Sequence, residues 1–464
     1  MSEWKKVKIG DVCKIVKGST GIASAEPGEY PLVVTAEERK SCSSYQFDCE
    51  AVCIPLVSSS GHGKKSLKNV HYQSGKFALG TILCAVIPNN SNELDARFLR
   101  QYLQFYKDTI LVPLMKGAAN VSLSMKDIAT VEFPLPPIEK QRELSELFVL
   151  LQEKEKNLNE EYEKQFEYTK QLRQNILQDA IEGKLTEEWR KNNPVVKGNP
   201  DFDAEALFER IQEEKSHTDS ILLTQNQGKK KKGKSLDFPN PCGNTEKLFV
   251  IPEGWKWVRL GEVIKEPPRN GYSPKAVDFE TPVKSLKLGA VTYGVFNPDE
   301  YKYINEDIPQ DSYCWLKNGD ILIERSNSIE YVGICAIYTG DDNEFMYPDL
   351  LMRFRVLDIL SNEYIHKAMI SPFNRAYFMN NAKGSQKTMP KINQDCVVNT
   401  IIPLPPLAEQ AEIVRVVEAQ LTKVDQLEKQ ITERETLTKR LMQSIMKDAF
   451  RRGKGNDNKK CNNS

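Results

Sequence analysis

The sequence repeats itself, and this repeat limits what the chain can fold into more than any other feature. The segment Trp4–Val12 recurs as Trp255–Val263, with Trp, Val, Ile or Leu, Gly, an acidic residue and Val at the same spacing. Pro134–Ile138 recurs as Pro403–Leu407. This second match continues without a gap through Gln141 and Gln410, Glu143 and Glu412, and Asp179–Ala180 and Asp448–Ala449. Matches in the same order predict two equivalent halves, each a globular domain followed by a proline-rich stop and a long polar segment.

The ungapped match has a constant separation of 403 − 134 = 269 residues, which we call the repeat offset. It relates every residue of the first long segment to one residue of the second.

The composition leaves nucleic-acid binding open. Lys and Arg number 64, and Asp and Glu also number 64, so the formal net charge is zero. Neutrality does not exclude DNA as a ligand, because only the surface that faces the phosphates must be positive. No apolar stretch approaches the roughly 18 residues that span a membrane, and the first residues lack the apolar core of a signal peptide. The 10 cysteines are therefore expected to be reduced, buried thiols of a cytoplasmic protein.

The long polar segments are predicted to be helices. Proline, the strongest helix breaker, is absent between Pro137 and Pro194 and again after Pro406. Each segment places apolar residues at seven of ten heptad positions. These seam residues are Leu144, Phe148, Leu151, Leu158, Tyr162, Leu172 and Ile176 in the first segment and Ile413, Val417, Val424, Leu427, Ile431, Leu441 and Ile445 in the second.

Neither helix can bury its apolar stripe alone, which favours a pair of antiparallel coiled-coil helices with an approximate two-fold axis. The alternative is that each helix packs on its own globular domain. A helix of about 43 residues spans roughly 65 Å, and a turn of duplex DNA about 34 Å. Such a rod could hold two globular domains well apart along DNA.

The globular parts, residues 1–135 and 251–404, are predicted to be mixed α/β, giving an α+β chain. Short apolar runs read as strands at residues 52–57, 81–87, 320–324 and 332–338, and helical runs cover 95–106 and 363–370. Each globular part is followed by a helix segment, at 136–185 and 405–455. A lysine-rich linker at 186–250, with a short helix over 204–215, precedes the second globular part, and a tail at 456–464 is expected to be disordered.

Several motifs resemble the specificity subunits of type I restriction-modification systems. They are PLPPIEKQRELSELFVLL at Pro134–Leu151, PLPPLAEQAEIVRVVEAQL at Pro403–Leu421, GKLTEEWR at Gly183–Arg190 and PEGWKWVRLGEV at Pro252–Val263. The resemblance covers the whole chain in architecture. It implies a non-catalytic, DNA-binding subunit without cofactor, whose two target-recognition domains each read half of a split sequence in the major groove. It also implies that the paired helices set the spacer and dock two methyltransferase subunits, with translocase-nuclease subunits joining for cleavage.

Three other motifs match the letters of a nucleotide-binding, a zinc or a nuclease site but lack the sequence context that each site needs. Residues 228–235 fit the letters of a P-loop, but no apolar strand precedes them, and Pro239 and Pro241 block the helix that a P-loop needs. Cys42, Cys49, Cys53 and His62 lack the paired knuckle spacing of a zinc site, so no metal is expected. A nuclease pattern at Pro200, Asp201, Glu213 and Lys215 falls on the linker helix instead of a sheet edge.

Four loops are the best candidates for contact with DNA, because bases and phosphates are read by Arg, Lys, Asn, Gln and Ser on loops. They are residues 58–65, 116–120, 324–328 and 383–388, and the second and fourth hold the same place in the two halves. The candidate residues are Ser59, Ser60, His62, Lys64, Lys65, Lys116, Asn120, Arg325, Asn327, Lys383, Ser385, Gln386 and Lys387. Arg325 suits a guanine edge, Asn327 an adenine edge and the lysines phosphates. Ordinary solvated turns have a similar composition.

Two other functional classes compete with a DNA reader. A coiled-coil adaptor that joins two protein-binding domains would share the architecture, but it would show neither sequence preference nor a steep dependence on salt. A self-contained enzyme is disfavoured, because no motif combines a nucleophile, a base and a binding loop at workable spacing.

Overall fold

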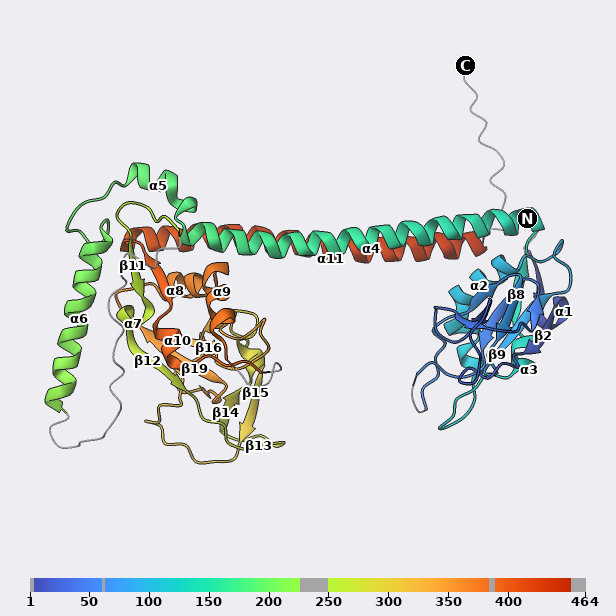
Figure 1. Ribbon diagram of the computed structural model, residues 1–464, viewed down its shortest axis with the longest axis horizontal. Coiled ribbons are helices and arrows are strands. Elements are labelled where there is room, and N and C mark those ends of the chain that lie inside the picture. Colours follow the sequence, from blue (N-terminus) through green and yellow to red (C-terminus); the bar gives the residue numbers. More distant parts are fainter. Residues whose placement is uncertain (1–3, 61–62, 226–248, 384–388, 452–464) are drawn as a thin grey trace, which may run out of the picture. The chain divides into compact units, whose positions relative to one another are not determined.

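The computed structural model describes residues 4–60, 63–225, 249–383 and 389–451. The chain forms two compact units, one from residues 1–164 with 432–464 and one from residues 165–431. Each unit combines a globular α/β domain with parts of two long helices, α4 (Ile138–Ile181) and α11 (Leu407–Arg451) (Figure 1). Sequence segments far apart in the chain therefore build each unit together.

The globular domain of the first unit is built on two four-stranded sheets. Its elements are β1 (Lys5–Lys8), α1 (Ile9–Val12), β2 (Cys13–Lys17), β3 (Tyr30–Val33), β4 (Lys40–Cys42), β5 (Phe47–Asp48), β6 (Ala51–Pro55), β7 (His71–Gln73), β8 (Lys76–Leu79), β9 (Leu83–Pro88), α2 (Ala96–Ile110), the 3-10 helix η1 (Val112–Leu114), α3 (Met125–Ala129) and β10 (Glu132–Leu135). The sheets have the orders β2-β9-β6-β7 and β4-β3-β8-β5, and β1 pairs with β10. Strand β6 is buried along its whole length, as its apolar sequence requires.

The globular domain of the second unit has the same plan. Its elements, with the linker before it, are η2 (Lys184–Thr186), α5 (Glu187–Asn192), α6 (Ala204–Gln225), β11 (Lys256–Arg259), α7 (Leu260–Val263), β12 (Ile264–Asn270), β13 (Ala276–Val277), β14 (Val283–Leu286), η4 (Leu288–Ala290), β15 (Tyr301–Ile304), β16 (Ile321–Glu324), β17 (Cys335–Ile337), β18 (Phe345–Met346), β19 (Leu351–Val356), α8 (Asn362–Ile370), α9 (Pro372–Asn381), α10 (Gln394–Val398) and β20 (Ile401–Leu404). The sheets have the orders β12-β19-β16-β17 and β13-β15-β14-β18, and β11 pairs with β20.

The two domains match strand for strand in their main sheet. β2, β9, β6 and β7 correspond to β12, β19, β16 and β17, and all neighbours in both sheets are antiparallel. The second sheets share a parallel pair, β3 with β8 and β14 with β18, but differ at the outer strand. There β5 pairs with β8, whereas β13 pairs with β15. The predicted strands and helices are confirmed, and the repeat extends to the fold of both domains.

The two predicted long helices are present and unbroken, with 44 residues in α4 and 45 in α11. In the first unit, the Tyr162 hydroxyl of α4 lies 2.9 Å from the Thr438 hydroxyl of α11, and the Phe148 ring of α4 stacks on the Phe450 ring of α11. The earlier residue of α4 thus contacts the later residue of α11. The helix segments of this unit are therefore antiparallel.

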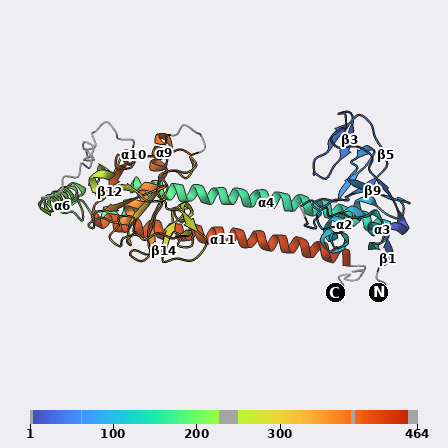
Figure 2. The ribbon, with the colours of Figure 1, turned by 90° about the horizontal axis from the view of Figure 1, so that it is seen from below.

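The helix segments of the second unit are also antiparallel. Arg173 donates to Glu428 of α11 (2.9 Å), and Thr186, just after α4, donates to Glu409 near the start of α11 (2.6 Å). Figures 1 and 2 show α4 and α11 side by side in both views. Neither helix simply folds back on the globular domain that precedes it.

The predicted seam consists of two sets of heptad positions, one beginning at Phe148 and Val417 and the other at Leu144 and Ile413. The first set is buried as predicted, and the second is largely exposed beyond its first residues. Phe148, Tyr162, Ile176, Val417, Val424 and Ile431 are buried, as are Leu144 and Ile413, while Leu151 and Ile445 are half-buried. The expectation is wrong for Leu158, Leu172, Leu427 and Leu441, which are 36–59% exposed. Each helix keeps the first set of positions on its buried face, so Leu158 and Leu172 lie outside that face, and on α11 Met442 is buried instead of Leu441.

The linker after α4 packs on the second unit. Helix α6 begins at Ala204 as predicted but continues to Gln225, well beyond the expected end at Lys215. Its residues Leu207 and Ile211 are fully buried in the core of that unit. The rejected P-loop at 228–235 and the tail at 456–464 lie outside the described residues.

The cysteines follow the prediction of buried thiols. In the described ranges, seven of the eight cysteines are buried, all eight are free, and Cys49 is half-buried. Burial raises the pKa of the Cys13 thiol to about 12, so it stays protonated. The described helices include none that is both long and apolar enough to cross a bilayer.

Candidate functional site

In the first unit, two of the predicted loops lie against each other. Val57, just after β6, forms a β-bridge with Ser122, and Lys116 forms another bridge with the same residue. The backbone N–H of Leu123 donates to the carbonyl of Leu56 (2.9 Å). The loops 58–65 and 116–120 therefore rise from a shared base at the end of β6.

In the second unit, the described residues that flank the other two predicted loops lie against each other in the same way. Ser326, just after β16, forms a bridge with Lys391, and Lys383 bridges to the same residue. The N–H of Ile392 donates to the carbonyl of Arg325 (3.0 Å). The four loops thus form two loop pairs, one in each unit.

The two loop pairs occupy equivalent positions in the repeat. Val57 and Ser326 are separated by the repeat offset, and so are their bridge partners Ser122 and Lys391. Their place before the proline stops related only the loops 116–120 and 383–388 in the sequence. The equivalence of the other two loops was missed, although the buried strands β6 and β16 that lead into them are related in the same way.

Ser59 and Ser60 stabilise their own loop. The Ser59 hydroxyl accepts from the N–H of Lys68 (3.0 Å), and the Ser60 hydroxyl lies 2.6 Å from that of Ser66. These side chains make the local contacts that order serine-rich turns. Their predicted role as readers of bases gains no support from these contacts, whereas a structural role in the loop does.

The lysines of the first loop pair are exposed. Lys64 and Lys65 lie at the solvent-exposed part of the loop, and Lys116 donates to the Asp127 carboxylate at 3.2 Å. Hydrogen bonds from Ser124 and Lys116 lower the pKa of Asp127, which favours its charged carboxylate. Asn120 is exposed, and His62 lies outside the described residues.

In the second loop pair, Arg325 and Asn327 differ in how far their side chains are engaged. Arg325 is half-buried and makes one long hydrogen bond, from Nη1 to the carbonyl of Asp349 (3.4 Å). Asn327 uses both ends of its amide: Nδ2 donates to Glu324 (2.7 Å), and Oδ1 accepts from the N–H of Ser328 (2.8 Å). The Arg325 guanidinium can turn toward a ligand by giving up only this one weak hydrogen bond, whereas the Asn327 amide is held in place.

The remaining candidates of the second loop pair lie on the loop before α10. Lys383 is exposed. Ser385, Gln386 and Lys387 lie outside the described residues, so their predicted roles stay predictions.

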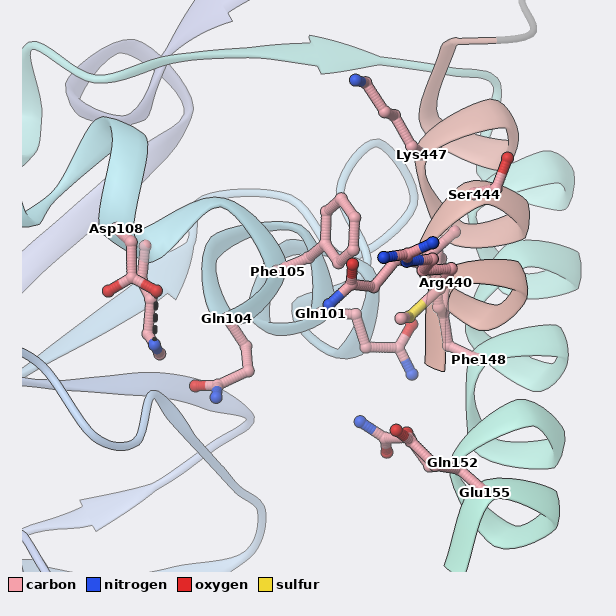
Figure 3. Close-up of a pocket in the computed structure, with 13 residues that line it drawn as sticks. Gln101, Gln104, Phe105, Asp108, Phe148, Gln152, Glu155, Arg440, Ser444 and Lys447 are labelled. Carbon is pink, nitrogen blue, oxygen red and sulfur yellow. Dashed lines mark hydrogen bonds and ion pairs between the residues drawn. The ribbon is translucent and has the colours of Figure 1, made fainter. Parts of the chain in front are cut away.

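A pocket in the first unit lies away from the loop pair, between α2, α4 and α11. Its volume is about 630 Å³, and Figure 3 shows Gln101 and Phe105 of α2 facing Phe148 of α4 and Arg440 of α11. Phe450, buried beside this pocket, stacks on Phe148 with ring centroids 4.5 Å apart. The pocket marks where the long helices meet the globular domain. In the described parts of the chain, no cluster of three or more His, Cys, Asp or Glu residues is arranged to hold a metal ion.

Three of the motifs that carry the family resemblance meet at one buried carboxylate, which the sequence analysis did not single out. Glu409 is 2% exposed and accepts from the Trp255 indole (2.7 Å), the Thr186 hydroxyl (2.6 Å) and the Arg190 guanidinium (2.5 Å). The start of the second globular domain, the segment after α4 and the start of α11 are therefore joined at one point. A charged residue shortly after a double proline was the available signal.

Comparison with known proteins gives one consistent family. The model of the type I restriction modification DNA specificity domain matches residues 1–164 and 252–435. The EcoDI specificity subunit of Escherichia coli is 25% identical over 452 residues, which cover 97% of this chain and 88% of that protein. The EcoKI subunit of strain K12 is 26% identical over 340 residues, and the EcoEI subunit 29% over 266. The chain spans only 61% and 41% of the length of these last two relatives.

Two solved structures share the fold over almost the whole chain. The HsdS subunit from Thermoanaerobacter tengcongensis has a TM-score of 0.51 at 17% identity and covers 97% of both chains. A chain from a study of assembly and conformational transition of the type I R-M system has a TM-score of 0.58 at 18% identity, covering 97% of this chain and 98% of that one.

Proposed function

Because this chain belongs to the type I restriction-modification DNA specificity family, we propose that it is the sequence-reading, non-catalytic subunit of such a complex, acting on DNA in the cytoplasm. One observation carries the proposal. The two loop pairs stand at equivalent positions, with the bridges Val57–Ser122 and Ser326–Lys391 related by the repeat offset. A duplicated framework that presents different loop sequences suits a protein that reads two different half-sites.

The chemistry of the loop pairs suits duplex DNA. Exposed Lys64, Lys65 and Lys383 can neutralise phosphates, which position a protein on DNA without specifying sequence. Arg325 carries a planar fork of donors that matches the O6 and N7 acceptors of guanine in the major groove. We assign Arg325 to base reading and the lysines to the DNA backbone.

The long helices suit the role of a spacer between two half-sites. We infer that α4 and α11 form an antiparallel coiled coil that relates the two target-recognition domains by an approximate two-fold. A helix of 44 residues spans about 66 Å, close to two turns of duplex DNA. The length of the pair would then fix the number of unread base pairs between the half-sites.

Exposed apolar residues on the two helices support the docking of one partner in two copies. Leu158, Tyr168 and Leu172 of α4 are exposed, and so are their repeat equivalents Leu427, Leu437 and Leu441 of α11. Contiguous exposed apolar side chains are typical of protein interfaces, and Tyr168 lies one helical turn from Leu172, as Leu437 does from Leu441. We assign them to two methyltransferase subunits, with translocase-nuclease subunits joining that complex. Leu172→Glu with Leu441→Glu should abolish co-purification of the methyltransferase, while Gln171→Glu with Arg440→Glu should not.

The experiment that tests the function is a methylation map. The chain is co-expressed with the methyltransferase subunit of its own system in a host that lacks adenine methylation, and modified bases are mapped across the genome. A split motif with a fixed spacer that depends on this chain is the expected result. A stable complex that methylates no sequence would contradict the proposal and favour the adaptor.

A further inference from the structure

Glu324, the last residue of β16, carries a fully buried carboxylate in the second unit. Its two oxygens accept hydrogen bonds from two different segments. Oε1 accepts from the hydroxyl of Thr292, in the turn after η4 (2.6 Å), and Oε2 accepts from the side-chain amide of Asn327 (2.7 Å). We call Glu324, Thr292 and Asn327 the Glu324 clamp. It joins the loop 324–328 to a turn that is distant in sequence.

The backbone on either side of the clamp is also fixed. The N–H of Arg325 donates to the carbonyl of Leu350 (2.9 Å), and the carbonyl of Arg325 accepts from the N–H of Ile392 (3.0 Å). Further along the loop, the Arg375 guanidinium donates to the carbonyl of Val332 (2.6 Å). Arg325 therefore projects from a backbone held on both sides, and the clamp fixes the residues that follow it.

Burial disfavours the charged form of the Glu324 carboxylate. Desolvation raises the pKa of Glu324, and the hydrogen bonds from Thr292 and Asn327 together with the charge of Arg375 oppose that rise. In some proteins a buried ionisable group is retained because its hydrogen bonds fix one arrangement, and removing one partner leaves the other unsatisfied. A buried acid directly before a proposed base-reading arginine is such a case.

We propose that Glu324 is a positioning residue for the second half-site, and that Asn327 serves this clamp instead of reading a base. The inference rests on the proposed function and names how one of its two reading loops is held. The loop Arg325–Ser328 is presented to DNA in one conformation, because Glu324 and the Ser328 N–H engage both ends of the Asn327 amide and fix its orientation, leaving one amide hydrogen and one Oδ1 lone pair outside these two contacts.

The first unit holds the equivalent loop by different chemistry. Pro55 is the repeat equivalent of Glu324, and the loop after it is ordered by the hydroxyls of Ser58, Ser59 and Ser60. Damage to the Glu324 clamp should therefore alter the reading of one half-site only.

Three variants of the full-length chain test the clamp. Asn327→Asp places two carboxylates 2.7 Å apart and should open the loop. Glu324→Gln should be tolerated, because its oxygen can accept from Asn327 while its amide donates to Thr292, whose hydroxyl then donates to the carbonyl of Leu288 (2.9 Å). The double variant Glu324→Gln with Asn327→Asp restores a donor–acceptor pair in the opposite sense.

Two readouts are taken on each variant. Hydrogen–deuterium exchange of the amides in residues 324–334 measures the clamp in the purified chain and needs neither DNA nor a partner. The methylation map of the co-expressed complex measures each half-site separately. We expect exchange to be roughly 10- to 100-fold faster in Asn327→Asp, together with a relaxed second half-site and an unchanged first one. The double variant should return both readouts to near the wild-type values.

The outcomes separate the possible failures. Unchanged exchange in Asn327→Asp would overturn the clamp. A second half-site that changes in Asn327→Asp and stays changed in the double variant, with exchange restored, would show that Asn327 reads a base itself. If the wild-type complex methylates no split sequence, the proposed function fails, and the exchange data still decide whether the clamp exists.

Discussion

Gln141 and Gln410 are repeat equivalents and make the same contacts in the two halves of the chain. Each donates from Nε2 to a carbonyl of the proline stop, Pro136 at 2.8 Å and Pro405 at 2.9 Å. Each also accepts at Oε1 from the backbone N–H of the residue that caps a domain helix, Asp95 of α2 at 2.9 Å and Ser361 of α8 at 3.3 Å. One amide in each half thus joins the start of a long helix to the globular domain.

Replacing this glutamine should loosen that joint. Gln410→Leu keeps most of the volume but leaves buried backbone groups without partners, which should lower the free energy of unfolding by about 1–3 kcal/mol. Urea denaturation followed by circular dichroism measures the change. Gln430→Leu, at an exposed position on the same helix, is the matched control and should shift stability by less than about 0.5 kcal/mol. Equal effects of the two substitutions would rule out the joint.

Glu409 should matter far more than the residue at the same place in the other half. Glu409→Ala removes the acceptor of Trp255, Thr186 and Arg190 and should destabilise the second unit by about 3 kcal/mol or more. The repeat equivalent, Lys140, forms only an exposed ion pair with Glu143, so Lys140→Ala should change stability by less than about 0.5 kcal/mol. Both values come from urea titrations, and a small effect of Glu409→Ala would contradict the role given to the buried carboxylate.

Phe450 should be essential to the first unit. Its ring lies 4.5 Å from Phe148 and 5.2 Å from Tyr102, and it is 4% exposed. Phe450→Ala should destabilise that unit by about 3–5 kcal/mol, as expected for loss of a buried aromatic residue. Leu441→Ala, an exposed position on the same helix, serves as the control in differential scanning calorimetry. A melting temperature that falls equally in both would refute the packing argument.

The second unit should lose stability in mild acid through His366. Burial lowers the pKa of this histidine from 6.5 to about 4, and its Nε2 donates to the carbonyl of Cys335 (2.9 Å). The folded state therefore resists protonation that the unfolded chain accepts. This contribution is fully present above pH 6.5 and is lost as the pH falls from 6.5 toward 4, with a slope of at most about 1.4 kcal/mol per pH unit.

His366→Gln keeps a donor for the same carbonyl but does not titrate, so it should flatten this slope. Urea titrations at pH 7, 6 and 5 measure it in both proteins. His71 of the first unit, whose pKa burial also lowers to about 4, leaves a residual acid sensitivity in the variant. Identical slopes for the two proteins would contradict the assignment.

Arg325 and Lys65 should have different effects on DNA recognition. Arg325→Ala should relax the sequence at one half-site, with a loss of about 1–3 kcal/mol in discrimination there. Lys65→Ala should weaken binding to all sequences alike and reduce its salt dependence, because lysine contacts with phosphates carry no sequence information. Methylation maps and salt titrations of DNA binding separate the two effects. Relaxation of both half-sites by Arg325→Ala would contradict a model of two independent readers.

The repeat made the framework predictable from sequence, and the limits of the repeat explain the misses. The motifs around Trp4, Trp255 and the two proline stops locate both domains and both long helices. The heptad positions did not predict the exposure of Leu158 and Leu172, because sequence spacing alone does not show which side of each apolar stripe faces the partner helix. The exposed face that results is now the best guide to partner docking.

The candidate loops could be located from composition, but the work of each side chain could not. Ser59, Ser60 and Asn327 have the chemistry of base readers, yet their hydrogen-bonding groups engage their own loops. The partners of Ser59 and Ser60, which are Lys68 and Ser66, lie outside the loop motif, and Glu324, the partner of Asn327, is held by the distant Thr292; only the fold defines these positions. Arg325 kept its predicted role as a candidate because its guanidinium makes only one long contact.

The burial of Phe450 among the aromatic rings of the first unit has a consequence for synthesis. The rings it covers, including Phe98, Tyr102 and Phe148, belong to the first third of the chain, whereas Phe450 lies close to its end. At translation rates of about 5–20 residues per second, roughly 15 to 60 s pass between the synthesis of Phe148 and that of Phe450. During that time the nascent first domain carries an open aromatic face, which makes it a substrate for chaperones and a point of vulnerability that the later half of the chain removes.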